Sequence, residues 1–357
     1  MLHSNTKFIL FILIIAAASF GCRKNNGGSY TAMEKKAVVT TIAGDGIDGF
    51  ADGPLLSARF ESPADVAVAA DGTMYVADYN DHRIRKISGG QVSTFAGNAG
   101  YGIVNGNGAS AQFQNPYRIT TDGNGNVYVL DGSDPRVRKI SAAADVITYA
   151  GTNQPGFLNG AALTAQFSAN ASGVVTDAQG NVYIGDIFNH RIRKISVAGQ
   201  VSTLAGSGAE GAGNGDAANA QFSYPQGVAA DAQGNIYVAD GGNFCIRKIA
   251  TSGIVSRFAG SGTRGTADGT AMVAQFNLIS DIVTDRQGNL YVGDNNSIRK
   301  VTPQGVVSTI AGSTEGYADG DGATAKFKGV GGLGIDAQGN IYVADINNNR
   351  IRKVSFQ

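Results

Sequence analysis

Histidine, the side chain most often used for acid–base catalysis and metal binding, is scarce in this chain of 357 residues. Only three histidines occur, and His82 and His190 fall at equivalent points of a recurring phrase. Pro135, Phe244 and Asn349 hold the same point in other copies. A position that accepts proline and phenylalanine is unsuited to a metal ligand, so these histidines indicate no metal centre.

The chain's two cysteines are Cys22 and Cys245. Cys245 replaces an arginine of the recurring phrase and has no histidine near it in sequence. We therefore interpret it as a small packed residue and not as a nucleophile.

Aspartate recurs so regularly that most copies are interpreted as architectural. One set ends the same apolar phrase six times: Asp78, Asp131, Asp186, Asp240, Asp294 and Asp345. We expect these carboxylates to cap the following turn or to pair with the arginine beyond it. A second set precedes glycine in tight-turn pairs: Asp52, Asn105, Asn159, Asn214, Asp268 and Asp319. A Ca²⁺ site needs several converging oxygens, which one side chain per loop does not supply.

Basic residues form a repeated stripe, of which Arg83, Arg85 and Lys86 are the first copy. Such a stripe could in principle bind nucleic acid. The chain, however, has 28 Lys+Arg against 28 Asp+Glu, and its cations recur in every copy instead of gathering in one patch. We therefore expect solvated or aspartate-paired structural roles and no nucleic-acid partner.

Three phrases recur in the same order and define six repeats. The tyrosines of the first phrase are Tyr75, Tyr128, Tyr183, Tyr237, Tyr291 and Tyr342. The second ends at Gly44, Gly97, Gly151, Gly206, Gly260 and Gly312. The third ends at Phe60, Phe113, Phe167, Phe222, Phe276 and Phe327. Each repeat contains four short runs with alternating apolar residues, separated by Gly-Asn or Asp-Gly turns. This pattern predicts an all-β, six-bladed β-propeller with four strands per blade, and it excludes TIM-barrel and Rossmann folds.

The two ends of the repeat array complement each other. The earliest phrase in the repeat array is Val38–Gly44, a copy of the second phrase, and we interpret it as an outermost strand without its three partners. The last repeat stops at Gln357 without an outermost strand. The N-terminal strand should therefore complete the last blade and close the ring, which removes an exposed sheet edge.

The repeats resemble those of the NHL family. The runs that carry the resemblance are PQGVAADAQGNIYVAD at Pro225–Asp240 and NHRIRKI at Asn189–Ile195, and it extends over residues 37–357. The longer loop of these repeats resembles bacterial extracytoplasmic proteins and the propeller of teneurins. Six-bladed relatives include peptidyl-hydroxyglycine lyases, with several metal-binding histidines, and gluconolactonase-like enzymes, with an ion held by Glu, Asn and Asp. Neither ligand set has a match here, so the resemblance implies no metal or other cofactor.

A functional site should break the sixfold pattern. Most NHL units have glycine five residues beyond the repeat phenylalanine, but three repeats have Asp65, Arg118 and Asp281 there. Tyr117 and Gln226 lie one position earlier in their repeats. Because the innermost strands begin around one mouth of a propeller's channel, these five residues are the candidate binding site for a small polar ligand or a peptide end. Mutual ion pairing that plugs the channel, or plain variation, is the alternative.

The N-terminus is typical of an export signal. Lys7 precedes an apolar run of 11 residues, Phe8–Ala18, which is too short to cross a bilayer as a helix. Ser19-Phe20-Gly21-Cys22 then resembles a bacterial lipoprotein signal, although Ser19 stands where leucine is usual. We predict a signal peptide at 1–21, lipidation of Cys22, a flexible tether at 22–36 and the propeller at 37–357.

These features favour a monomeric, non-catalytic binding or scaffold module. It would be an extracytoplasmic lipoprotein, periplasmic or at the cell surface, anchored by its lipid in a membrane that we expect to be the outer one. Its partner would be a protein, peptide or glycan of the cell envelope. Two alternatives remain: a metal-dependent lyase or lactonase with its site in the channel, and a purely structural part of an envelope complex.

Overall fold

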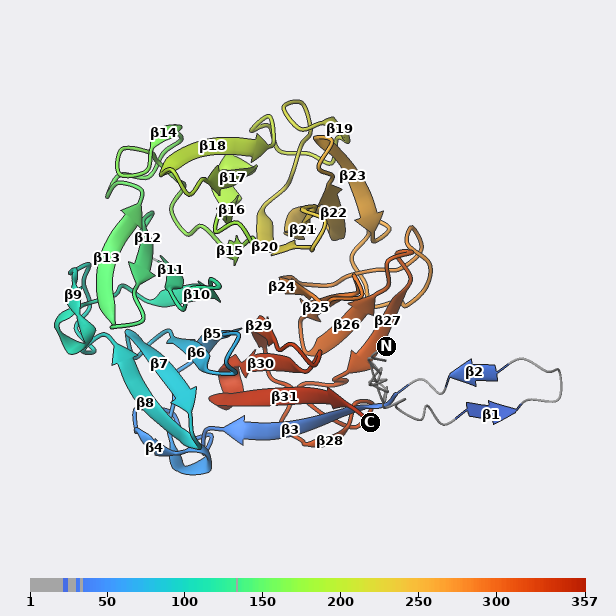
Figure 1. Ribbon diagram of the computed structural model, residues 1–357. Helices are drawn as coiled ribbons and strands as arrows, with labels where there is room; N and C mark the ends of the chain where they lie inside the picture. The colour runs from blue at the N-terminus through green and yellow to red at the C-terminus, as the bar shows by residue number, and fades with distance from the viewer. Residues whose placement is uncertain (1–21, 25–29, 33–34, 133) are drawn as a thin grey trace, which may run out of the picture. The chain divides into compact units, whose positions relative to one another are not determined.

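The computed structural model describes residues 22–24, 30–32, 35–132 and 134–357. Contacts divide the chain into a unit that ends at Lys35 and a unit from Lys36 to Gln357. In the first, β1 (Cys22–Lys24) pairs with β2 (Tyr30–Ala32). The second is a ring of six antiparallel sheets that the chain builds in sequence order (Figure 1). The predicted all-β, six-bladed propeller is therefore confirmed.

The two inner strands of each blade carry the most buried residues. The innermost strands are β5 (Pro63–Val68), β10 (Pro116–Thr121), β15 (Gly173–Thr176), β20 (Pro225–Ala230), β24 (Ile279–Thr284) and β29 (Val330–Ile335). The second strands are β6 (Met74–Asp78), β11 (Val127–Asp131), β16 (Val182–Asp186), β21 (Ile236–Asp240), β25 (Leu290–Asp294) and β30 (Ile341–Asp345). These second strands lie between neighbouring blades, which explains their nearly unbroken apolar sequences.

The two outer strands contain buried residues mixed with partly or fully exposed ones. The third strands are β7 (Arg83–Ser88), β12 (Val137–Ile140), β17 (Arg191–Ile195), β22 (Cys245–Ile249), β26 (Ser297–Val301) and β31 (Arg350–Phe356). The fourth strands are β8 (Gln91–Ala96), β13 (Asp145–Ala150), β18 (Gln200–Ala205), β23 (Ile254–Ala259), β27 (Val307–Ala311) and β3 (Ala37–Ala43). We number blades 1 to 6 by their innermost strands, β5, β10, β15, β20, β24 and β29.

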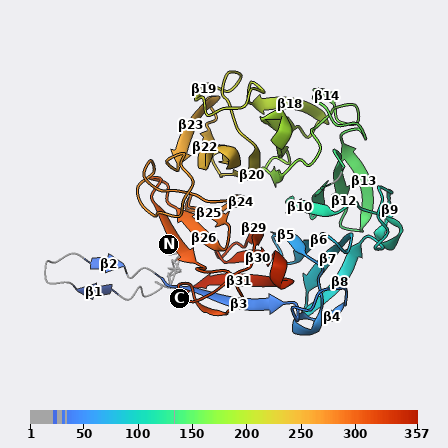
Figure 2. The ribbon, with the colours of Figure 1, turned by 180° about the vertical axis from the view of Figure 1, so that it is seen from behind.

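Strand β3 completes blade 6, as the sequence predicts. It pairs with β31 along its whole length, from Ala37 opposite Phe356 to Ala43 opposite Ile351. Figures 1 and 2 show the two strands side by side from both faces of the ring. Beyond the paired strands, the backbone amides of Lys36 and Gln357 each donate to the other's carbonyl. The first and last strands of the propeller, which lie at opposite ends of its sequence, thus pair in the same sheet and close the ring.

The sequence does not predict a fifth, two-residue strand that covers the outer edge of five blades. It lies in the long loop ahead of each innermost strand and pairs with the outermost strand of the same blade. These strands are β4 (Gly53–Pro54), β9 (Gly106–Asn107), β14 (Gly160–Ala161), β19 (Gly215–Asp216) and β28 (Gly320–Asp321). In each, the glycine has a positive φ, between 125° and 155°. The loops therefore protect sheet edges that would otherwise be open to pairing with another chain.

Single-turn 3₁₀ helices complete the connections. They are η1 (Leu55–Ser57), η2 (Gly108–Ser110), η3 (Ile187–Asn189), η4 (Gly241–Asn243) and η5 (Ile346–Asn348). The last three form turns between second and third strands, and each ends at a residue in the left-handed conformation.

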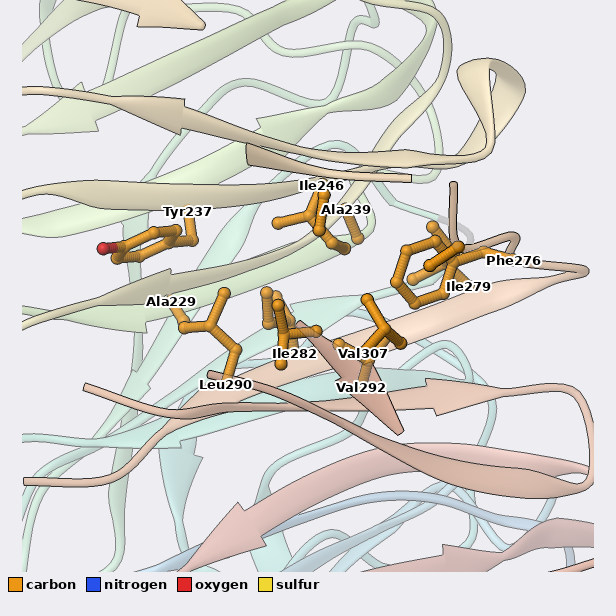
Figure 3. Close-up of a cluster of buried hydrophobic side chains, with 13 residues drawn as sticks. Ala229, Tyr237, Ala239, Ile246, Phe276, Ile279, Ile282, Leu290, Val292 and Val307 are labelled. Carbon is orange, nitrogen blue, oxygen red and sulfur yellow. The ribbon is translucent and has the colours of Figure 1, made fainter. Parts of the chain in front are cut away.

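The hydrophobic core consists of interfaces between successive blades. Figure 3 shows the interface of blades 4 and 5, where Tyr237 and Ile246 face Ile282 and Leu290. Phe276 is fully buried at its outer end. The repeat phenylalanine thus anchors each long loop in the core just before the chain turns inward to form the innermost strand.

A buried arginine in every third strand fastens the long loop to its blade. In blade 3, Arg193 Nη1 donates to Asp186 Oδ2 at 2.8 Å and to the Gln166 carbonyl. Its Nη2 donates to the Leu158 carbonyl and to Asn159 Oδ1 at 2.8 Å. The arginines in this role are Arg85, Arg138, Arg193, Arg247, Arg299 and Arg352. The expected aspartate-paired structural role of the basic stripe is therefore confirmed for its second arginine.

Candidate binding site at the mouth of the channel

The innermost strands of all six blades surround a cavity of about 220 Å³ along the channel. Asp65, Arg118 and Asp281 line it near the end where these strands begin. The three side chains are buried, with relative exposures of 3%, 1% and 8%. The structure thus brings three of the five candidate residues together inside the channel.

Asp65 connects blade 1 to blade 2. Its Oδ2 accepts a hydrogen bond from the backbone amide of Ile119 at 2.9 Å, and its Oδ1 accepts one from the amide of Val66 at 2.7 Å. The carboxylate lies against Gly332 of blade 6, where an added Cβ would be only 1.8 Å from Oδ1. The glycine at this position of blade 6 thus makes room for the larger side chain of the neighbouring blade.

Asp281 makes the same kind of connection between blades 5 and 6. Its Oδ2 accepts a hydrogen bond from the amide of Leu333 at 2.9 Å. Gly227 of blade 4 leaves the space for it, because a Cβ there would be 2.5 Å from Asp281 Oδ1. Both carboxylates therefore hold adjacent innermost strands together, which is a structural use of positions that break the repeat.

Arg118 crosses the channel. Its Nε donates to the Ser172 carbonyl of blade 3 at 2.9 Å, and its Nη2 donates to the Ser280 carbonyl of blade 5 at 2.8 Å. Blades 2 and 5 lie on opposite sides of the ring (Figure 1). Nη2 also donates to the Tyr117 hydroxyl at 3.3 Å, whereas Nη1 has no hydrogen-bond partner among the described residues. The guanidinium therefore spans the channel and obstructs it below the channel mouth.

The pKa of Asp65 is raised from 3.8 to about 8: burial is the largest cause and the negative charge of Asp281 adds to it, while Arg118 and the two backbone amides oppose both. The folded protein then keeps a proton that the unfolded chain loses near pH 4, so this contribution to stability is complete at acid pH. It should be lost as the pH rises towards 8, by up to about 1.4 kcal/mol per pH unit. Asp65→Asn should flatten the pH dependence of the free energy of unfolding, although it weakens one of the two hydrogen bonds that Asp65 accepts from backbone amides. Urea unfolding of both proteins across this range measures the slopes, and parallel curves would contradict the assignment.

Tyr117 and Gln226 do not line this channel cavity and lie at the channel mouth, on the other side of the Arg118 guanidinium. They line a hollow of about 240 Å³ together with Tyr79, Gly132, Asn170, Ser172 and Ile187. A second hollow of about 240 Å³ adjoins it, lined by Ser62, Ala64, Tyr79, Asn80, Tyr117 and Ile346. The two hollows share Tyr79 and Tyr117, whose rings meet edge to face at 6.0 Å between centroids. We call these two hollows together the mouth site.

The mouth site offers hydrogen-bonding groups that the fold does not use. Among the described residues, the side-chain amides of Asn170 and Gln226 have no hydrogen-bond partner, and the Tyr79 hydroxyl has none. Because Tyr117 accepts from Arg118, its own O–H remains available as a donor. None of the lining residues carries a charged side chain.

Sequence reasoning missed Tyr79, which belongs to both hollows. It directly follows the repeated Asp78, at a position held elsewhere by Gly132, Ile187, Gly241, Asn295 and Ile346. Four of these six residues line the mouth site. Variation at this point of the turn between the second and third strands was therefore a usable signal, equal in kind to the one that identified Tyr117 and Gln226.

The two histidines of the recurring phrase and Cys245 are in positions that serve the fold. His82 and His190 accept, through Nδ1, backbone amides at the start of the following blade, from Asn115 and Tyr224. Cys245 is fully buried, and burial raises the pKa of its thiol to about 12. The described part of the chain contains no group of three or more His, Cys, Asp or Glu side chains that could hold a metal ion. It also has no helix long and apolar enough to cross a membrane.

Comparison with known proteins supports the NHL resemblance of the repeats. Residues 60–87 and 222–249 match the NHL repeat. The chain is 28% identical over 280 residues, 72% of its length, to Protein SUPPRESSOR OF QUENCHING 1, chloroplastic, of Arabidopsis thaliana. It is 25% identical over 386 residues, 92% of its length, to human Teneurin-4. It spans only 26% and 14% of these two proteins. With its six blades, the chain is an NHL-repeat propeller.

Solved structures share the fold. An auxiliary nutrient binding protein from Bacteroides thetaiotaomicron superposes with a TM-score of 0.68 at 17% identity, over 93% of this chain and 81% of that one. A gluconolactonase from Xanthomonas campestris superposes with a TM-score of 0.59 at 12% identity, over 90% of each chain. The fold is thus shared by a binding protein and an enzyme, and these likenesses are evidence for the fold alone.

Proposed function

We propose that this protein is a non-catalytic binding propeller of the bacterial cell envelope. It is exported, anchored by a lipid on Cys22, and holds a protein, peptide or glycan of the envelope at the mouth site. The observation that carries the proposal is the mouth site itself. Two joined hollows lie over a channel barred by Arg118, and their lining includes amide and hydroxyl groups without partners in the fold.

The chemistry of the lining supports binding over catalysis. General acid–base catalysis needs a group whose pKa lies near the working pH. The mouth site is lined by Tyr, Asn, Gln, Ser, Ile, Ala and Gly residues, and burial raises the pKa of Tyr79 above its ordinary value of 10.0. Asp65, whose pKa is raised to about 8, and Asp281 line the channel cavity and not the mouth site, and both are buried and accept hydrogen bonds from backbone amides. The auxiliary nutrient binding protein offers a precedent for binding on this fold.

The test is binding by the purified full-length protein and its mouth variants. Glycan and peptide arrays identify a ligand, and titration calorimetry measures its affinity. Tyr117→Ala and Gln226→Ala should each weaken binding about tenfold or more, because each removes a contact made in a confined polar site. Gln233→Ala, an exposed glutamine in a turn between first and second strands, is the matched control and should bind normally. Unchanged affinity in both mouth variants would refute the site.

The anchor is tested separately. Labelling of cells with radioactive palmitate should mark the wild-type protein and leave Cys22→Ser unlabelled. Label retained by the variant would contradict lipidation at this cysteine.

A further inference from the structure

We infer that the ligand of the mouth site is a neutral glycan of at least two sugar residues. The inference rests on the proposed binding function and narrows its ligand from three classes to one. It is argued from three properties of the mouth site: its lack of charge, its aromatic surface and its division into two hollows.

The absence of charge separates the candidate classes first. Neither hollow has an Asp, Glu, Lys, Arg or His side chain in its lining. The cation beneath them, Arg118, lines the channel cavity instead and donates to the carbonyls of Ser172 and Ser280. A peptide end carries a full charge, and burying it without a partner is costly. A phosphorylated or uronic acid ligand would likewise need cations, usually arginine. A neutral sugar needs only hydrogen-bond donors and acceptors, which amides and hydroxyls supply.

The aromatic surface fits a sugar ring. Tyr79 and Tyr117 are half-buried and line both hollows. The Arg118 guanidinium lies over one face of the Tyr117 ring, 4.4 Å from its centroid. A pyranose has an apolar face of C–H groups that packs on an aromatic ring, and a rim of hydroxyls. Around the rings stand the unpartnered amides of Asn170 and Gln226. An amide both donates and accepts, which matches a hydroxyl that does the same.

The two hollows indicate the length of the ligand. Each has a volume of about 240 Å³, and they meet at Tyr79 and Tyr117. A single sugar would occupy one of them, whereas two linked sugars would place one ring on either side of the tyrosine pair. An extended peptide has a weaker claim, because peptides commonly add to an open strand edge. Here the loop strands such as β4 cover outer edges of the blades.

The experiment is an array of neutral and acidic oligosaccharides and of peptides, probed with the full-length protein. Neutral oligosaccharides of two or more sugars should bind, and added salt should leave their affinity unchanged. Titration calorimetry measures the affinities, because the chain has 13 tyrosines and their combined fluorescence would not report on the mouth site alone. Tyr117→Ala should reduce affinity about tenfold or more, and Tyr117→Phe, which keeps the ring, should reduce it less. Gln233→Ala should match wild type.

The outcomes separate this inference from the function beneath it. If no neutral oligosaccharide on the array binds the protein, the glycan assignment is overturned. So does a peptide or acidic sugar whose binding the mouth variants abolish, although that result would keep the proposed binding function. A neutral oligosaccharide that binds both mouth variants as tightly as wild type would overturn the site and the inference together.

Discussion

Arg193→Met should destabilise the propeller by about 3–5 kcal/mol, because it leaves the buried carboxylate of Asp186 without its cation. Arg193 is fully buried and donates four hydrogen bonds, two of them to carbonyls of the long loop. Methionine has a similar shape but no donors, so the loop would also lose its attachment to the blade. Urea unfolding followed by circular dichroism gives the change in the free energy of unfolding.

Two variants make this prediction specific. Lys328→Met breaks an exposed pair, in which Nζ lies 3.7 Å from Glu315 Oε1, and should cost less than about 1 kcal/mol. Arg193→Met combined with Asp186→Asn removes both buried charges and should recover part of the lost stability. A loss for Arg193→Met no larger than that for Lys328→Met would show that the buried pair contributes little.

The repeat made most of the fold predictable, because each phrase was seen six times. Strand order, blade number and closure by Val38–Gly44 follow from the register of the phrases alone. The fifth strands were missed because Gly53-Pro54 and its equivalents are too short for periodicity to show. Their glycines have the expected positive φ, but the side chains before them do more than turn the chain. Asp52, for example, accepts a hydrogen bond from buried Arg85 as well.

The basic stripe shows what spacing alone leaves open. Arg85 and Lys86 are neighbours on one strand, so their side chains point to opposite faces. Arg85 is fully buried beside Asp78, whereas Lys86 is half-buried. Sequence reasoning assigned the stripe to structure but could not tell which arginine enters the core. That choice depends on the long loop, whose carbonyls come from residues more than 20 positions away.

The five candidate site residues were found by one rule, yet the structure divides them. Asp65 and Asp281 hold neighbouring blades together, Arg118 bars the channel, and only Tyr117 and Gln226 line the mouth site. The rule identifies departures from the repeat. It does not distinguish a departure that serves packing from one that serves a ligand, because adjacent positions on a strand face different surroundings.

Deletion of the chain through Ala43 should prevent the propeller from folding, whereas deletion through Lys35 should leave it intact. Without β3, blade 6 loses its outermost strand, and β31 becomes an open edge that can pair with another chain. Val39 and Ala43, both fully buried, would also be lost from the core. We expect insoluble or unfolded protein, measured by solubility, circular dichroism and the thermal melting temperature.

A point variant and a peptide keep this prediction decisive if the truncated chain cannot be purified. Val39→Asp places an unpaired charge in the blade 6 core and should destabilise the full chain by about 3 kcal/mol or more. A synthetic peptide of residues 36–44, added during refolding, should restore soluble propeller to the truncated chain, because β3 contributes its backbone pairing and Val39 without needing the covalent link. If the truncated chain instead melts at the same temperature as the chain that begins at Lys36, the ring is closed by contacts between innermost strands alone, and β3 only covers an edge.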